Sequence, residues 1–145
     1  MNPREYYEHI INTMPEGIER RIIYIMRNYI GKEKSIEKGR LVIMLKAHGF
    51  FKDAAFSTAE RQLRYAIGEI NNDPNQKVII IGSTGNGGYY LPANPEECSV
   101  YIATERSRAD EVNNKLKSIE NKASEIFELV TTPATAEVEL QPCLF

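Results

Sequence analysis

Hydrophobic side chains recur at helical spacing in the first part of the chain. The first predicted helix spans residues 15–30, with Pro15 in its first turn and Gly31 ending it. Its apolar side carries Ile18, Ile22, Ile25, Met26 and Ile30. A second predicted helix follows Ser35 as N-cap and stops before Gly49, and an aromatic loop covers residues 50–56.

A third helix is predicted from the capping box Ser57-Thr58-Ala59-Glu60 to the Asn71-Asn72-Asp73-Pro74 stop. Its inner face carries Ala59, Leu63, Ala66, Ile67 and Ile70. Two short β-branched or aromatic runs follow, residues 78–81 and 88–91, and a Gly-rich segment joins them. This pattern predicts a β-hairpin.

The last predicted helix is long. Asn94 is its expected cap, Pro95 lies in the first turn, and two acidic residues face the helix dipole. Further along, apolar residues follow each other at alternating spacings of four and three, which is an a/d heptad seam. The seam is Val112, Leu116, Ile119, Ala123, Ile126 and Val130. It favours pairing of two copies through this helix; packing of the helix back on its own domain is the alternative.

The elements therefore predict an α+β fold, mostly α: three helices and a β-hairpin, then a long C-terminal helix. Residues 1–14 are expected to form an N-terminal arm and residues 15–93 a winged-helix domain. Residues 94–130 are expected to form a helical stem and residues 131–145 a flexible tail rich in Thr, Ala and Pro. A length of 145 residues suits one such domain with an appendage.

Charge is unevenly distributed, although the net charge is only −2. Residues 20–64 hold eleven basic and four acidic side chains, a local charge of +7. Residues 94–129 hold five basic and eight acidic side chains, a local charge of −3. A basic segment of this kind is typical of a phosphate-binding surface, although solvated helix faces give the same pattern.

One ordered set of residues runs from the third helix through the hairpin to the last helix: Ser57, Arg61, Leu63, Arg64, Ala66 and Ile67, then Gly88-Tyr89-Tyr90-Leu91, then Pro95-Glu96-Glu97. This set resembles small winged-helix proteins of phages and prophages of Gram-positive bacteria. The resemblance covers about residues 18–129. The long aromatic loop before Ser57 and the segment 71–76 depart from the family pattern. The resemblance implies binding of double-stranded DNA, in transcription regulation or in replication initiation.

Candidate DNA contacts cluster on the outer side of the third helix. Arg pairs with guanine edges and Gln with adenine edges in the major groove, and recognition helices make such contacts near their start. The expected set is Ser57, Thr58, Arg61, Gln62, Arg64 and Tyr65. The alternative is that the two arginines only pair with Glu60 or Glu69.

The hairpin supplies a second candidate set, Lys77, Ser83, Thr84 and Asn86, for contacts to backbone or minor groove. A plain Gly-rich turn is the alternative. The segment Gly85-Asn86-Gly87-Gly88 lacks the features of a nucleotide-binding loop.

The final five residues, Gln141-Pro142-Cys143-Leu144-Phe145, resemble the short peptide with which bacterial proteins dock on the replication sliding clamp. In that interpretation Gln141, Leu144 and Phe145 contact the clamp, with the two apolar side chains as anchors. A meaningless apolar end is the alternative. A protein-binding adaptor or inhibitor is accordingly the second function class.

Nothing in the sequence predicts catalysis, a metal or a cofactor. His9 and His48 stand alone, and Cys98 and Cys143 have neither metal-ligand nor disulfide spacing. No apolar run approaches the roughly 20 residues of a membrane span, and no secretory leader is evident. We therefore expect a non-enzymatic, cytoplasmic protein.

Overall fold

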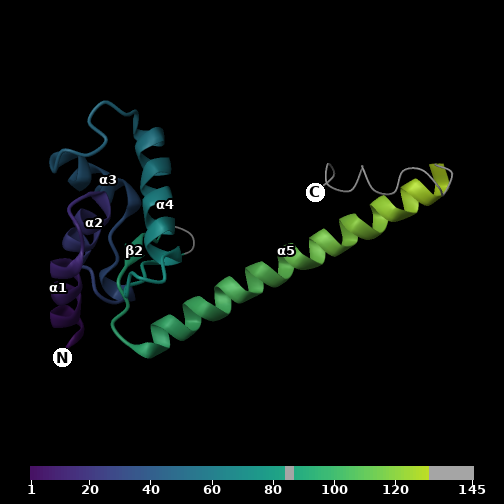
Figure 1. The fold of residues 1–145 in the computed structure, drawn as a ribbon. Coiled ribbons are helices and arrows are strands. Elements are labelled where there is room, and N and C mark those ends of the chain that lie inside the picture. Colours follow the sequence, from purple (N-terminus) through teal and green to yellow (C-terminus); the bar gives the residue numbers. More distant parts are fainter. Residues whose placement is uncertain (84–86, 131–145) are drawn as a thin grey trace. The chain divides into compact units, whose positions relative to one another are not determined.

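The structure is a computed structural model that describes residues 1–83 and 87–130. These divide into two units, Met1–Tyr101 and the part of Ile102–Phe145 that is described. The fold is mostly helical, with a small two-stranded antiparallel sheet and a long C-terminal helix. Figure 1 shows the helices α1 to α4 and the sheet within the first unit. These features confirm the coarse fold class expected from the sequence.

Residues 1–14, which were expected to form an N-terminal arm, contain helix α1 (Pro3–Thr13). The Asn2 side chain caps the helix by accepting a hydrogen bond from the Glu5 N–H at 2.8 Å. Tyr7, Ile10, Ile11 and Met14 are buried in the hydrophobic core. Their spacing of three, one and three residues is a helical apolar face, which was present in the sequence and was missed.

Helix α2 (Ile18–Met26) is shorter than predicted. It ends before Tyr29 because the following backbone pairs with the sheet instead. The Leu91 N–H donates to the Tyr29 carbonyl at 2.9 Å, and the Gly31 N–H donates to the Leu91 carbonyl at 2.8 Å. Gly31 has a φ of +98°, a conformation that glycine adopts readily and that lets the chain turn here.

Helices α3 (Lys38–Ala47) and α4 (Phe56–Asn72) form as expected, but neither predicted N-cap is used. The 3₁₀ turn η1 (Lys32–Lys34) precedes Ser35, and α3 begins three residues after that serine. Helix α4 begins at Phe56, so Ser57 lies inside its first turn and makes no capping bond. The Phe56 ring packs against Gly39 of α3, and this packing accompanies the earlier start of α4.

The sheet consists of β1 (Ile81–Gly82) and β2 (Tyr89–Tyr90), with Ile81 opposite Tyr90. Residues 78–80 of the predicted strand do not pair with another strand. The Asn71 side chain instead accepts from the Ile80 N–H at 2.8 Å and donates to its carbonyl at 3.0 Å. A side-chain amide thus replaces the neighbouring strand for this residue.

On its other edge, β2 pairs with the segment between α2 and α3. Ile36 and Tyr89 exchange two backbone hydrogen bonds of 2.8 Å each, an antiparallel bridge. Val78, Ile80, Tyr89 and Leu91 are buried in the same core as the inner faces of α1 to α4. The hairpin is therefore joined to the helices both by backbone pairing and by apolar packing.

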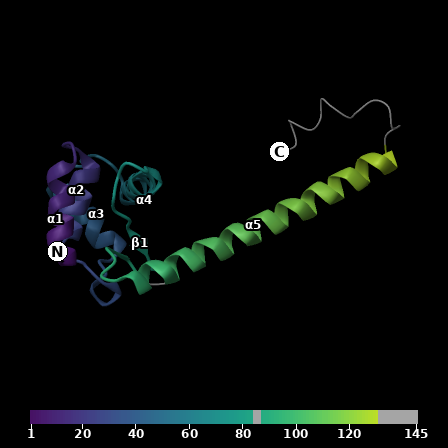
Figure 2. The same cartoon turned by 60° about the horizontal axis from the view of Figure 1, so that its bottom comes forward.

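Helix α5 (Pro95–Val130) begins where the sequence predicted. The Glu97 N–H donates to the Asn94 side chain at 2.9 Å. The Glu97 carboxylate in turn accepts from the Ala93 and Lys32 N–H groups, each at 2.8 Å, which connects the first turn of α5 to η1. Figure 2 shows α5 as one uninterrupted helix.

Candidate nucleic-acid interface

The outer face of α4 gathers all six residues that the sequence singled out on this helix. All six are exposed, and Tyr65 keeps 71% of its surface accessible. The predicted inner face is confirmed, because Ala59, Leu63, Ala66, Ile67 and Ile70 are all buried. In the following, the "α4 face" means Ser57, Thr58, Arg61, Gln62, Arg64 and Tyr65.

Apolar packing fixes which side of α4 is presented. Leu63 and Ile70 are almost completely buried in the core shared with α2 and α3. Because side chains three and four residues apart share one side of a helix, burying Leu63 and Ile70 leaves Arg61 and Arg64 on the opposite side. The α4 face is therefore held in place by the core beneath it and not by contacts of its own side chains.

The two arginines of the α4 face are not neutralised by neighbouring acids. Among the described residues, the ion pairs are Arg4–Glu8, Arg20–Glu16 and Arg108–Glu105, and none includes Arg61 or Arg64. The alternative in which Glu60 or Glu69 pairs with them is therefore not what the structure contains. Both guanidinium groups keep their hydrogen-bond donors available to a ligand.

Tyr89 connects the α4 face with the start of α3. Burial raises the pKa of Tyr89, and the nearby positive charge of Arg64 opposes this shift. The Lys38 ammonium lies 5.8 Å from the centre of the Tyr89 ring. Lys38, which the sequence analysis did not single out, is thus a cation beside the same tyrosine that Arg64 acts on. The sequence signal that could have found Lys38 is its place in residues 20–64, the segment with a local charge of +7.

The hairpin candidates are only partly brought together with the α4 face. Lys77 lies at the other end of α4, where its carbonyl accepts from the Tyr6 hydroxyl and its ammonium donates to the Pro74 carbonyl at 3.1 Å. Ser83 is partly exposed at the start of the tip, and its N–H donates to the Gly88 carbonyl at 2.8 Å. Thr84 and Asn86 lie outside the described residues.

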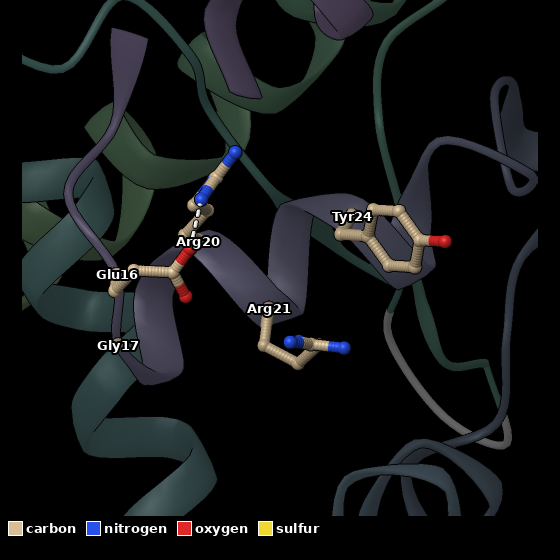
Figure 3. Close-up of a pocket in the computed structure, with 5 residues that line it drawn as sticks. All are labelled: Glu16, Gly17, Arg20, Arg21 and Tyr24. Carbon is tan, nitrogen blue, oxygen red and sulfur yellow. Dashed lines mark hydrogen bonds and ion pairs between the residues drawn. The ribbon is translucent and has the colours of Figure 1, made fainter. Parts of the chain in front are cut away.

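A second polar surface lies on α2, where a pocket is lined by Glu16, Gly17, Arg20, Arg21 and Tyr24 (Figure 3). Its arginines already have partners. Arg20 pairs with Glu16 and also donates to the Ile11 carbonyl at 3.1 Å, and Arg21 lies 2.8 Å from the His48 ring nitrogen Nδ1. Arg21 and Arg27 both lie over the Tyr24 ring. The arginines of this pocket are therefore already engaged by other residues of the domain.

The remaining chemistry-bearing residues form no further centre. Within residues 1–83 and 87–130, no three His, Cys, Asp or Glu side chains lie together as a metal site would require. His9 is exposed on α1, and Cys98 is partly buried at the start of α5. No helix in the same ranges is long and apolar enough to cross a membrane.

The structure describes the candidate residues of the stem but not those of the tail. Val112, Leu116, Ile119 and Ile126 are exposed on α5, and Ala123 is partly exposed. Gln141, Leu144 and Phe145 lie outside the described residues.

No family model matches this chain, and no match was found among curated proteins or solved structures. The interpretation of the α4 face therefore rests on the chain's own residues.

Proposed function

We propose that this protein binds double-stranded DNA as a winged-helix protein, with α4 as the recognition helix in the major groove. The order of elements supports this: α3 and α4 are packed together, and the β1–β2 hairpin follows directly. The pairing of Ile36 with Tyr89 adds a third backbone segment beside the hairpin. The observation that carries the proposal is the exposed α4 face, whose two arginines form no ion pair with another described residue.

The chemistry of the α4 face fits a duplex. Arg61 and Arg64 can each donate two hydrogen bonds to a guanine edge, and Gln62 can pair with adenine. Lys38, whose ammonium lies 5.8 Å from the centre of the Tyr89 ring, supplies a further charge that can contact phosphate. From the resemblance of its sequence to phage and prophage proteins, we further propose a role in transcription regulation or replication initiation in the cytoplasm, without a catalytic step.

The double substitution Arg61→Ala, Arg64→Ala is expected to weaken binding to duplex DNA by at least about tenfold. Each lost base-directed pair removes roughly 1–3 kcal/mol of interaction. If the arginines contact phosphate instead, the slope of log affinity against log salt should become shallower by up to about two. Fluorescence anisotropy with labelled random and phage-derived duplexes across a salt series measures both quantities.

A matched control removes two positive charges elsewhere, Arg4→Ala on α1 and Lys117→Ala on α5, both exposed. This variant should keep its affinity and its salt slope, because neither residue lies on the α4 face. Equal losses in the two double variants would show a non-specific charge effect. Absent or salt-insensitive binding by the unmodified protein would favour the adaptor function, for which the −3 charge of residues 94–129 is the motivation.

A further inference from the structure

Helix α5 carries an exposed apolar seam. Val112 is 65% exposed and Ile126 is 56% exposed, and Leu116 and Ile119 are exposed between them. In heptad notation Leu116 and Ala123 are a positions, and Val112, Ile119 and Ile126 are d positions. Exposed apolar side chains in this register are buried when the helix pairs with a second helix.

The seam begins after Glu105. This residue occupies a d position, and its carboxylate accepts a hydrogen bond from the Arg108 guanidinium at 2.9 Å. A carboxylate would be unfavourable inside the apolar seam. The arrangement therefore restricts close pairing to the part of α5 from Ala109 onward.

The charges that flank the seam are distributed unequally. Three successive g positions, each preceding an a residue, are basic: Arg108, Lys115 and Lys122. The e positions, which follow each d residue, include Glu120 and the neutral Asn113. All five side chains are exposed. In coiled coils the e and g side chains face each other across the seam and determine orientation.

We propose that α5 pairs in parallel with α5 of a second copy of this chain. Parallel pairing places g against e, which brings Lys115 opposite Glu120 of the second copy, twice in each dimer. Antiparallel pairing places g against g, which brings Lys115 opposite Lys122. The first arrangement gives two attractive contacts and the second gives repulsive ones, so the flanking charges select the parallel orientation.

The parallel orientation determines where the two proposed DNA-binding units can bind on a duplex. Helix α5 has 36 residues, about 54 Å at 1.5 Å per residue. In a parallel pair both chains enter the stem at the same end, so two α4 faces can meet one duplex at neighbouring half-sites. This consequence rests on the proposed function, whereas the pairing itself does not.

Charge reversal tests the orientation, because it should weaken self-association of a parallel pair and strengthen that of an antiparallel pair. In a parallel pair, Lys115→Glu places two carboxylates together and should weaken self-association by about tenfold. Glu120→Lys should do the same, and the combined variant should restore association. Lys117→Glu, on the outer side of α5, is the matched control and should change little. Sedimentation equilibrium measures each constant.

Stronger self-association after Lys115→Glu would overturn the proposal. In an antiparallel pair, Lys115→Glu would face Lys122 and tighten association. An unmodified protein that stays monomeric at all concentrations would also overturn it. Neither outcome depends on DNA, so failure here is distinct from failure of DNA binding.

A cross-linking experiment gives a second, independent readout. Ile119→Cys, in a chain where Cys98 and Cys143 are replaced by Ser, should form a disulfide-linked dimer under mild oxidation. Parallel pairing brings the two copies of this d position together, whereas antiparallel pairing does not. Asn121→Cys on the outer side of the helix is the control and should remain uncross-linked. Cross-linking of the control alone would contradict the parallel seam.

Discussion

Replacing Gly88 by alanine is expected to lower the free energy of unfolding of the first unit by about 3 kcal/mol or more. A Cβ at this buried position would lie 1.6 Å from the Ile36 carbonyl oxygen and 2.4 Å from its carbon. These are backbone atoms, so no side-chain rotation relieves the clash. The strand must move away from Ile36, which breaks the two Ile36–Tyr89 hydrogen bonds, each worth about 1 kcal/mol.

The matched control is the same substitution at Gly68, inside α4. No atom lies within 4 Å of a Cβ built there, so alanine should stabilise the helix by about 0.5–1 kcal/mol. Urea denaturation followed by circular dichroism measures both variants. If Gly88→Ala cost no more than a typical surface substitution, the tight approach of β2 to Ile36 would be refuted.

The elements that periodicity alone can predict were predicted well. The buried face of α4 follows from apolar spacing, because a helix of this length buries whatever stripe its sequence offers. The start of α5 was also predicted correctly, because Asn94 caps its own helix through a bond to Glu97 three residues away. Both signals are local and need no knowledge of the rest of the fold.

The errors arose where a distant residue decides the local structure. Ile80 is kept out of the sheet by the Asn71 side chain, and α2 ends early because Tyr29 pairs with Leu91. The helix α1 was missed for a different reason: its apolar stripe is short and lies among exposed polar residues. A single sequence gives no sign of which remote partner a backbone group will find.

The residues of the candidate site also divide into those that local sequence could predict and those that depend on distant contacts. The six residues of the α4 face could be predicted because one amphipathic helix presents them all. The position of Lys38 could not be predicted, because it depends on Tyr89 of β2 lying beside the start of α3. Lys77 lies beyond the other end of α4, where its carbonyl accepts from the Tyr6 hydroxyl, and its predicted DNA contact stays a prediction.

Tyr7 provides the sharpest test that α1 belongs to the domain. Tyr7→Ala is expected to lower the free energy of unfolding by about 3–5 kcal/mol, as removal of a buried aromatic ring does. The side chain is only 5% exposed, and its hydroxyl donates to the Pro92 carbonyl, 85 residues further along the chain. Tyr7→Phe keeps the ring and loses only this bond, so it should cost about 1 kcal/mol.

The pH dependence of stability distinguishes the contribution of the Tyr7 hydroxyl from that of its ring. Burial raises the pKa of Tyr7, so an unfolded chain ionises this tyrosine near pH 10 while the folded chain still holds the proton. Its contribution is therefore complete below about pH 10 and is lost as pH rises further. Tyr7→Phe should make the alkaline loss of stability shallower. Part of the alkaline loss of stability should remain in this variant, because burial also raises the pKa values of Tyr89 and Tyr90.

Tyr65→Ala is the control that separates the core from the proposed interface. Tyr65 is exposed on α4, so its loss should change the free energy of unfolding by no more than about 0.5 kcal/mol. The same variant should weaken DNA binding, because the ring lies on the α4 face beside Arg61 and Arg64. Tyr7→Phe should show the reverse pattern, with altered stability and unchanged affinity. If Tyr7→Ala unfolded like the unmodified protein, packing of α1 in the core would not stabilise the domain.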